Sequence, residues 1–385
     1  MTPEMKMRPT ILTSLFSLTV ILMSGCKPKL ETHATFITNG HTGTVYTIST
    51  HARELPHVAG ILRKNVDMVT SALADRQPDN ELARLNRIGD TVRMPISQLT
   101  FRAIDLARHY SELTDGLFDV TTGDIAALWA RGIPADDILQ EHLSRIGTRF
   151  IETSDNNTIA FLSPGIKITA GLLAAAYAVD VGIVDMRRSN SGPFLFNLNT
   201  FARREGQFPP PGDALLPLAP AGFPTLGNIN LKEHRSLAAV SLNQATPGTN
   251  ARPFIVRIDP RAGTPASGAL AVAVAGPLTI KAYTLAEALL VAGPGPEGEA
   301  LMRRFEEYDA LLITMASPMI VYATEGFMNV FQPAPDINID MRTWKIKDEA
   351  SASLSGILQI GQPGTPFIES FSHDSADEIF MPESD

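Results

Sequence analysis

One glycine-rich string in the sequence has the spacing of a phosphate-binding loop. Residues 293–298, Gly-Pro-Gly-Pro-Glu-Gly, fit the pattern G-x-G-x-x-G. The two prolines lack the backbone N–H groups that a pyrophosphate would use. The string also follows a predicted helix, whereas a dinucleotide-binding loop follows a strand. We therefore interpret residues 293–298 as a connecting loop.

The histidine, cysteine and serine patterns do not support three other common chemistries. The eight histidines show no metal-ligand spacing such as His-Glu-x-x-His, and the single cysteine, Cys26, excludes an internal disulfide and a cysteine-based metal site. The sequence contains no Gly-x-Ser-x-Gly elbow and no P-loop. Zinc chemistry, catalysis by a serine in a nucleophile elbow and P-loop nucleotide hydrolysis are therefore not predicted.

The overall charge argues against a nucleic-acid partner. The 385 residues carry a formal net charge of −9 and no basic run, so the chain lacks an electrostatic footprint for a phosphate backbone. Its 44% apolar content is enough for a sizeable core, and 28 Pro and 28 Gly indicate many turns. We expect a folded α+β protein that does not bind nucleic acid.

An aromatic and acidic pair, Phe118-Asp119, is the candidate with the most specific surroundings. Asp115-Gly116 just before it is typical of a turn that enters a strand, and this interpretation needs no ligand. The longer string over residues 110–121, Tyr-Ser-Glu-Leu-Thr-Asp-Gly-Leu-Phe-Asp-Val-Thr, is followed by Leu128-Trp129. It resembles the signature Thr-x-Gly-x-Phe-Asp-x-Thr…Leu-Trp of the bacterial FAD:protein FMN transferases, the ApbE family.

Other strings resemble the same family in the same order over roughly residues 33 to 331. The central stretch, residues 168–185, contains Tyr177-Ala178-Val179-Asp180, which matches the family's Tyr-Ala-Val-Asp. Shorter resemblances occur at residues 39–44, 73–86, 194–201 and 254–265. The resemblance implies the α+β flavin transferase fold, with mixed sheets and packed helices.

The resemblance also implies an activity and its ligands. The activity is the Mg²⁺-dependent transfer of FMN from FAD to a threonine of a periplasmic redox protein. The implied FAD-binding positions are Thr42, Arg76, Leu117, Phe118, Asp119, Asp180 and Val256. The implied Mg²⁺ positions are the backbone carbonyl of Ala174 and the side chains of Tyr283 and Glu287.

Several of these positions differ in residue type from the family pattern. Tyr283 stands for an Asp and Glu287 for a Thr, while Ala175 replaces a Lys and Val256 a His. An i, i+4 pair points both side chains at one spot, but a phenol that stays protonated near neutral pH is a poor Mg²⁺ ligand. Three interpretations stay open: a weakly active or inactive FMN transferase, a non-catalytic lipoprotein that binds a flavin or a protein partner on the same scaffold, and an enzyme that hydrolyses FAD to FMN and AMP. The third would need the same metal as the first.

Hydrophobic periodicity predicts the elements that position these residues. Helices are expected with Val58, Ile61, Leu62, Val69 and Leu73 on one face, and over residues 99–110, 134–146, 168–185 and 280–292. Strands are expected at residues 44–48, 194–201, 237–241, 269–275, 311–313 and 319–322. Residues 207–227 are expected to form a long loop.

The N-terminal residues resemble a lipoprotein export signal. Lys6 and Arg8 precede an apolar run that is short for a permanent membrane helix, and Met23-Ser24-Gly25-Cys26 resembles a lipobox. The alternative is an ordinary cleavable signal with an incidental cysteine. In both cases the mature chain faces the periplasm, and a lipidated form is anchored in the inner or outer membrane.

These features predict four segments. Residues 1–25 form the signal peptide, residues 26–32 a tether that begins at the lipidated Cys26, residues 33–331 the flavin transferase domain, and residues 332–385 a partly disordered C-terminal extension.

Overall fold

The computed structural model describes most of the chain between residues 30 and 346. The described ranges are 30–39, 42–51, 53–75, 78–154, 156–198, 200–206, 215–220, 223–232, 235–242, 256–316 and 318–346. The predicted signal peptide, Cys26, Arg76 and residues 347–385 lie outside them. In these ranges no helix combines the length and the apolar character needed to cross a membrane.

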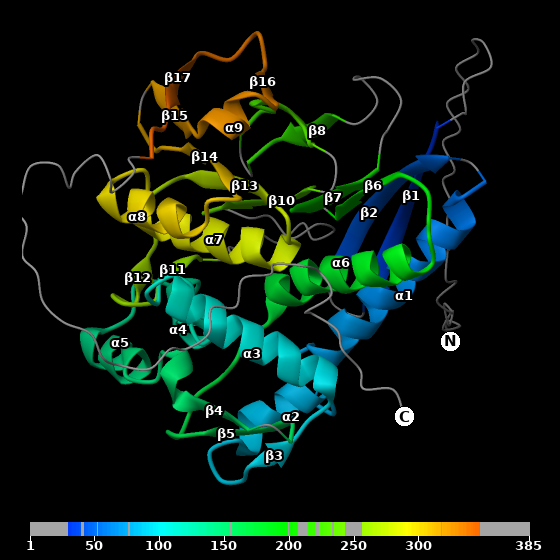
Figure 1. Cartoon of the computed structure of the whole chain (residues 1–385). Coiled ribbons are helices and arrows are strands. Elements are labelled where there is room, and N and C mark those ends of the chain that lie inside the picture. Colours follow the sequence, from blue (N-terminus) through cyan, green and yellow to red (C-terminus); the bar gives the residue numbers. More distant parts are fainter. Residues whose placement is uncertain are drawn as a thin grey trace, which may run out of the picture.

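A nine-stranded sheet lies at the centre of the described part of the chain (Figure 1). Its order is β1-β2-β6-β7-β10-β13-β14-β15-β17, and neighbours are antiparallel except β15 and β17, which are parallel. The strands are β1 Leu30–Asn39, β2 Thr42–His51, β6 Phe194–Leu198, β7 Phe201–Glu205, β10 Arg235–Ser241, β13 Ala271–Gly276, β14 Asp309–Ile313, β15 Met319–Ala323 and β17 Ile339–Thr343.

Strand β13 shows why this sheet lies inside the protein. All six residues of β13 are buried. Val272 and Val274 belong to the core on one face, whereas Ala271, Ala273 and Ala275 belong to the core on the other face. Successive side chains of a strand point to opposite faces, so apolar residues at every position require a cover on both faces.

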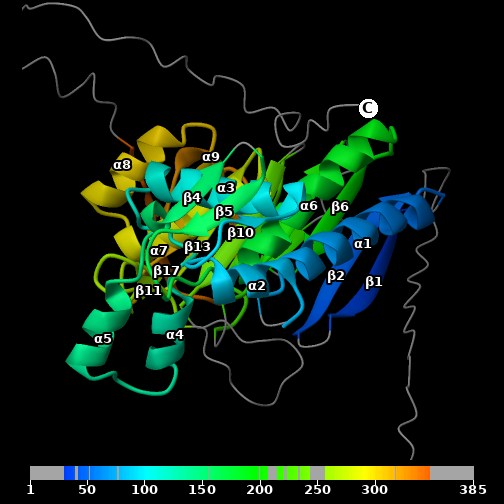
Figure 2. The same ribbon diagram turned by 90° about the horizontal axis from the view of Figure 1, so that it is seen from below.

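Three long helices cover one face of the sheet (Figures 1 and 2). They are α1 Leu55–Ala72, α6 Gly171–Arg188 and α7 Thr279–Ala292. Helix α1 packs along α6, and α7 contacts β10 and β13. A Cβ at Gly182 would lie 3.0 Å from Cδ2 of Leu62. The glycine therefore allows α6 to approach α1 closely.

The opposite face is covered by a small sheet and a short helix (Figure 1). The small sheet has the order β16-β9-β8. Its elements and the helix are β8 Leu215–Leu218, β9 Gly227–Asn230, β16 Phe331–Pro333 and α9 Glu325–Met328. Leu216, Ile229 and Phe327 are buried there against Leu311 of the large sheet.

A further layer lies on the outer side of the long helices (Figure 1). It contains α2 Glu81–Ile88, α3 Gln98–Leu113, α4 Gly123–Trp129, α5 Asp136–Leu143, the 3₁₀ turn η1 Thr148–Phe150, and a sheet of β3 Met94–Pro95, β5 Thr158–Phe161 and β4 Ile151–Ser154. The hairpin of β11 Ile258–Asp259 and β12 Thr264–Pro265, and helix α8 Pro296–Arg304, complete the described elements. Asn80 and Ser97 cap α2 and α3, as residues of these types do.

Most predicted elements are confirmed, and the differences have physical causes. The helices predicted around Val58 to Leu73, residues 99–110, 168–185 and 280–292 correspond to α1, α3, α6 and α7. The loop predicted over residues 207–227 contains β8, whose Leu-Leu-Pro-Leu sequence includes a proline and which lies at a sheet edge, where proline is tolerated. The strand predicted over residues 194–201 is a β6–β7 hairpin, because Phe201 already starts the return strand.

Two further predictions differ in detail from the structure. The helix predicted over residues 134–146 is shorter, α5 Asp136–Leu143; it buries no residue completely and leaves Ile138 43% exposed. Residues 339–343, predicted within the C-terminal extension, form β17 and pair with β15.

Candidate functional site

Tyr283 and Glu287 lie one turn apart on α7 and are joined by a side-chain hydrogen bond. A third residue, Arg257, meets both of them. Its Nη1 lies 2.8 Å from Oε1 of Glu287, and its guanidinium also hydrogen-bonds the Tyr283 side chain. The predicted meeting of residues 283 and 287 at one spot is therefore confirmed, and Arg257 is an addition to it.

Aromatic rings hold Tyr283 in place. Its ring packs edge-on against Phe118 at 6.0 Å between centroids and against Phe201 at 5.6 Å. Only 6% of Tyr283 is exposed. Burial, helped by the negative charge of Glu287, raises the pKa of the Tyr283 hydroxyl well above its ordinary value of 10.0. The phenol is therefore neutral near physiological pH.

Arg257 and Glu287 form an ion pair that is nearly closed to solvent. Their side chains are 11% and 12% exposed. Burial raises the pKa of Glu287, while the charge of Arg257 and the hydrogen bond with Tyr283 oppose that shift. The guanidinium and the carboxylate thus balance each other's charge inside the protein.

These donors do not suit Mg²⁺. A magnesium ion prefers six hard oxygen ligands and keeps several waters, so it needs available anionic oxygens and room for hydration. Here Tyr283 is protonated, Glu287 is paired with a cation, and Ala174 is 4% exposed in the first turn of α6. In the described ranges no three His, Cys, Asp or Glu side chains are grouped to hold a metal. The donor set does not support the predicted metal site.

Asp119 directs both carboxylate oxygens to groups of the protein itself. Oδ1 accepts the backbone N–H of Thr121 at 2.8 Å and its hydroxyl at 2.6 Å, and Oδ2 accepts the N–H of Thr148 at 3.0 Å. Burial raises the pKa of Asp119, and the same hydrogen bonds oppose the shift. Asp119 thereby ties the segment after α3 to the turn at η1.

The turn before Asp119 has the conformation that its residues predict. Asp115 and Gly116 have φ values of 51° and 76°, which aspartate and glycine tolerate better than other residues. Leu117 and Phe118 then enter the core, with 2% and 5% exposed. The turn is confirmed, but the strand expected after it does not form, because residues 117–122 have irregular backbone and lead into α4. The contact of Leu117, Phe118 and Asp119 with FAD stays a prediction.

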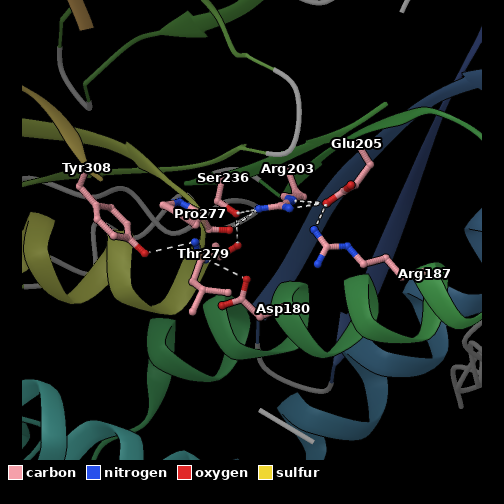
Figure 3. Close-up of polar contacts among 9 residues, drawn as sticks. Asp180, Arg187, Arg203, Glu205, Ser236, Pro277, Thr279 and Tyr308 are labelled. Atoms are coloured by element: carbon pink, nitrogen blue, oxygen red, sulfur yellow. Dashed lines mark hydrogen bonds and ion pairs between the residues drawn. The ribbon is translucent and has the colours of Figure 1, made fainter. Parts of the chain in front are cut away.

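Asp180 is buried between α6 and α7 (Figure 3). It is 2% exposed, and its Oδ1 and Oδ2 accept the backbone N–H groups of Thr279 and Ile280, each at 2.8 Å. The N-cap residue of α7, Leu278, has no capping side chain. Asp180 therefore supplies the cap from another helix, and its predicted contact with FAD stays a prediction.

A chain of polar contacts continues from Thr279 to the sheet (Figure 3). The hydroxyls of Thr279 and Ser236 are 2.8 Å apart, and Arg203 Nη1 donates to Ser236 Oγ at 3.1 Å. Arg203 also donates through Nε to Glu205 at 2.9 Å, and Arg187 of α6 donates to the same carboxylate at 3.2 Å. This network joins α6, α7, β7 and β10.

Val256 lies in an apolar setting. It packs on a small core of Ile125, Ile146 and Ile258, which suits its residue type. Arg257 beside it is the functional candidate that sequence reasoning missed. A signal was available, because Arg257 is the only charge in the run Phe-Ile-Val-Arg-Ile over residues 254–258.

Two predicted FAD positions, Thr42 and Arg76, remain. Thr42 is the first residue of β2 and pairs with Asn39 of β1. Arg76 falls outside the described ranges. Their predicted roles stay predictions.

Solved structures of flavin transferases share this fold. The flavinyl transferase ApbE of Pseudomonas stutzeri, in its apo form, superposes with a TM-score of 0.67 at 18% identity and covers 81% of this chain and 100% of that chain. The flavin transferase ApbE of Vibrio cholerae gives a TM-score of 0.65 at 18% identity, covering 78% of this chain and 100% of that chain. At this identity the likeness concerns the fold, and it confirms the predicted flavin transferase architecture.

Sequence comparison indicates the same family. A protein named FAD:protein FMN transferase from Vibrio cholerae is 27% identical over 176 residues, which are 42% of this chain and 51% of that protein. One of the same name from Chlamydia pneumoniae is 24% identical over 138 residues, covering 34% and 44%. The chain thus spans about half the length of the curated relatives it matches. Residues 42–312, more than half of the chain, match the pattern of the ApbE family, and the chain belongs to that family.

Proposed function

We propose that this chain is a non-catalytic member of the ApbE family, which binds a flavin on the transferase scaffold and does not carry out Mg²⁺-dependent FMN transfer. The observation that carries the proposal is the cluster of Arg257, Glu287 and Tyr283. In it the carboxylate is paired with a guanidinium and the phenol is neutral. Flavin as the ligand is supported by family membership.

The chemistry of transfer explains why this cluster matters. Breaking the FAD pyrophosphate needs positive charge on the phosphate oxygens and a group that activates the incoming threonine hydroxyl. Two positions that could help, Ala175 and Val256, carry neither charge nor a proton-transfer group. Preorganised charges and proton carriers each supply orders of magnitude in rate, so their joint absence favours a binding role.

A transfer assay tests the proposal directly. The purified chain is incubated with FAD, MgCl₂ and a threonine-containing acceptor domain, and covalent FMN on the acceptor is measured by in-gel fluorescence and mass. The transferase of Vibrio cholerae under the same conditions is the positive control. We expect FAD binding by calorimetry without acceptor labelling. Mg²⁺-dependent labelling with multiple turnovers would contradict the proposal.

We also propose that the chain is a lipoprotein anchored through Cys26 on the periplasmic side of a membrane. The support is the charged, apolar and lipobox-like order of residues 1–26. Expression of the full chain in a bacterial host should place it in the membrane fraction with a mass increase from lipid, and Cys26→Ser should abolish that mass increase. An unmodified, soluble wild-type chain would exclude the anchor.

A further inference from the structure

We propose that the Arg257 guanidinium is the resident cation of this site in place of a divalent metal, and that it clamps the β11–β12 hairpin onto α7. The inference deepens the proposed function and rests on it for the absence of metal-dependent transfer. It concerns a property that can be measured without any flavin, namely the metal affinity of the cluster and its contribution to folding.

Charge balance favours Arg257 as the cation of this site. Glu287 contributes one negative charge and Arg257 one positive charge at 2.8 Å, with both side chains almost closed to solvent. A divalent cation entering here would have to displace the guanidinium from its carboxylate or sit beside it. Like charges repel strongly where water is excluded. Arg257 therefore neutralises the charge of Glu287 and repels a divalent metal.

Tyr283, the neighbour of this ion pair, carries no charge. Tyr283 is held edge-on by Phe118 and Phe201, and its hydroxyl hydrogen-bonds Glu287 and Arg257. A phenol, whose ordinary pKa is about 10, is neutral near pH 7 and adds no anionic oxygen to attract a metal. The cluster therefore contains one cation, one anion and one neutral phenol.

The Arg257–Glu287 pair joins two separate elements of the fold. Arg257 lies just before β11, while Glu287 is on α7. The same hairpin forms a second ion pair, in which Nη1 of Arg261 lies 2.5 Å from Oε1 of Glu297 in α8. The side chains of Arg261 and Glu297 are 43% and 45% exposed. The hairpin is thus fastened by one buried and one exposed arginine. Because exposed pairs contribute little and breaking a buried pair is costly, Arg257 is the effective clamp.

The matched arginines allow a controlled metal-binding test. EDTA-treated full chain, Arg257→Met and Arg261→Met are titrated with Mn²⁺ and followed by electron paramagnetic resonance of the free ion. We expect no stoichiometric uptake by the wild type or Arg261→Met at millimolar Mn²⁺. Uptake of one Mn²⁺ per chain by the wild type, lost in Glu287→Gln, would overturn the inference.

Thermal unfolding tests the clamp. Arg257→Met leaves Glu287 buried without its cation, so we expect the melting temperature to fall by about 5 °C or more, against about 2 °C or less for Arg261→Met. Arg257→Met/Glu287→Met removes both charges and should recover most of the loss. The clamp would be overturned if the two single arginine variants lowered the melting temperature equally. It would also be overturned if Arg257→Met/Glu287→Met lowered the melting temperature by the sum of the two single effects. If Arg257→Met alone does not fold, recovery in the double variant decides the question.

Failure of this inference and failure of the proposed function give different results. Wild-type chain that takes up Mn²⁺ yet labels no acceptor overturns the resident cation and leaves the binding role intact. Wild-type chain that labels the acceptor without taking up metal overturns the binding role and leaves Arg257 as the resident cation.

Discussion

Asp180 of α6 caps a different helix: its Oδ2 accepts the backbone N–H of Ile280, in the first turn of α7, at 2.8 Å. Thr279 donates to the other oxygen at the same distance. The first N–H groups of a helix have no partner inside it, and Asp180 accepts two of them. One carboxylate thereby fixes the position of α7, on which Tyr283 and Glu287 lie.

Replacing Asp180 by asparagine should destabilise the fold even in the absence of flavin. Asparagine offers one acceptor oxygen, so one buried N–H of α7 loses its partner, and we expect a loss of about 1–3 kcal/mol of unfolding free energy. Urea denaturation followed by circular dichroism measures it. Asn80→Ala, at the cap of α2, is the control for an ordinary helix cap, with a loss of about 1 kcal/mol. A D180N variant as stable as the wild type would argue against the capping role.

The same carboxyl should impose a pH dependence of stability. Burial raises the pKa of Asp180 above its ordinary value of 3.8, although the hydrogen bonds from Ile280 and Thr279 oppose the shift. Between the unfolded pKa and the higher folded pKa, the native state holds a proton that the unfolded state has lost. The contribution is therefore complete below the unfolded pKa and decreases as pH rises through the folded pKa.

Denaturation of wild type and D180N in parallel, from acidic to neutral pH, isolates this contribution. The unfolding free energy of the wild type minus that of D180N should decrease with rising pH. An increase would mean that the native fold favours the charged carboxylate, contrary to the burial that we describe.

Asp119 should likewise contribute to the stability of the fold in the absence of FAD. Asp119→Ala leaves the N–H groups of Thr121 and Thr148 without their acceptor, so we expect a loss of about 2–4 kcal/mol without FAD. Asp124→Ala, which breaks the exposed pair with Lys167 at 2.8 Å, is the control and should cost about 1 kcal/mol or less. Unchanged stability combined with lost FAD binding would instead assign Asp119 to the ligand alone.

Removing the hydroxyl of Tyr177 should keep or raise stability, unlike the replacements of Asp180 and Asp119. Tyr177 is fully buried, and its hydroxyl has no hydrogen-bond partner among the described residues. Burial raises the pKa of this hydroxyl above its ordinary value. Removing an unsatisfied buried polar group should not cost stability. We expect Tyr177→Phe to be as stable as the wild type or more stable by up to about 1 kcal/mol, whereas Tyr177→Ala should lose about 3–5 kcal/mol. A substantial loss in Tyr177→Phe would reveal a partner for the hydroxyl.

The sequence predicted those features that depend on neighbouring residues. The face of Val58, Leu62 and Val69 follows helical spacing and is buried in α1. The Asp115-Gly116 turn follows from residues that tolerate positive φ. The spacing of Tyr283 and Glu287 brings them together because one helical turn separates them. In each case local geometry is enough.

Contacts between distant segments depended on the tertiary structure. Asp180 meets Thr279 across 99 residues, and Arg257 meets Glu287 only because the β11–β12 hairpin folds against α7. A family pattern identifies residues at matching positions, but it does not show which other side chain contacts a residue that differs from the pattern. The chain alone therefore determined the apolar framework of a flavin transferase. The packing of the hairpin on α7 decided that a guanidinium faces the Glu287 carboxylate. A buried charge loses its hydration and needs a partner, and only the folded structure determines which side chain lies beside it.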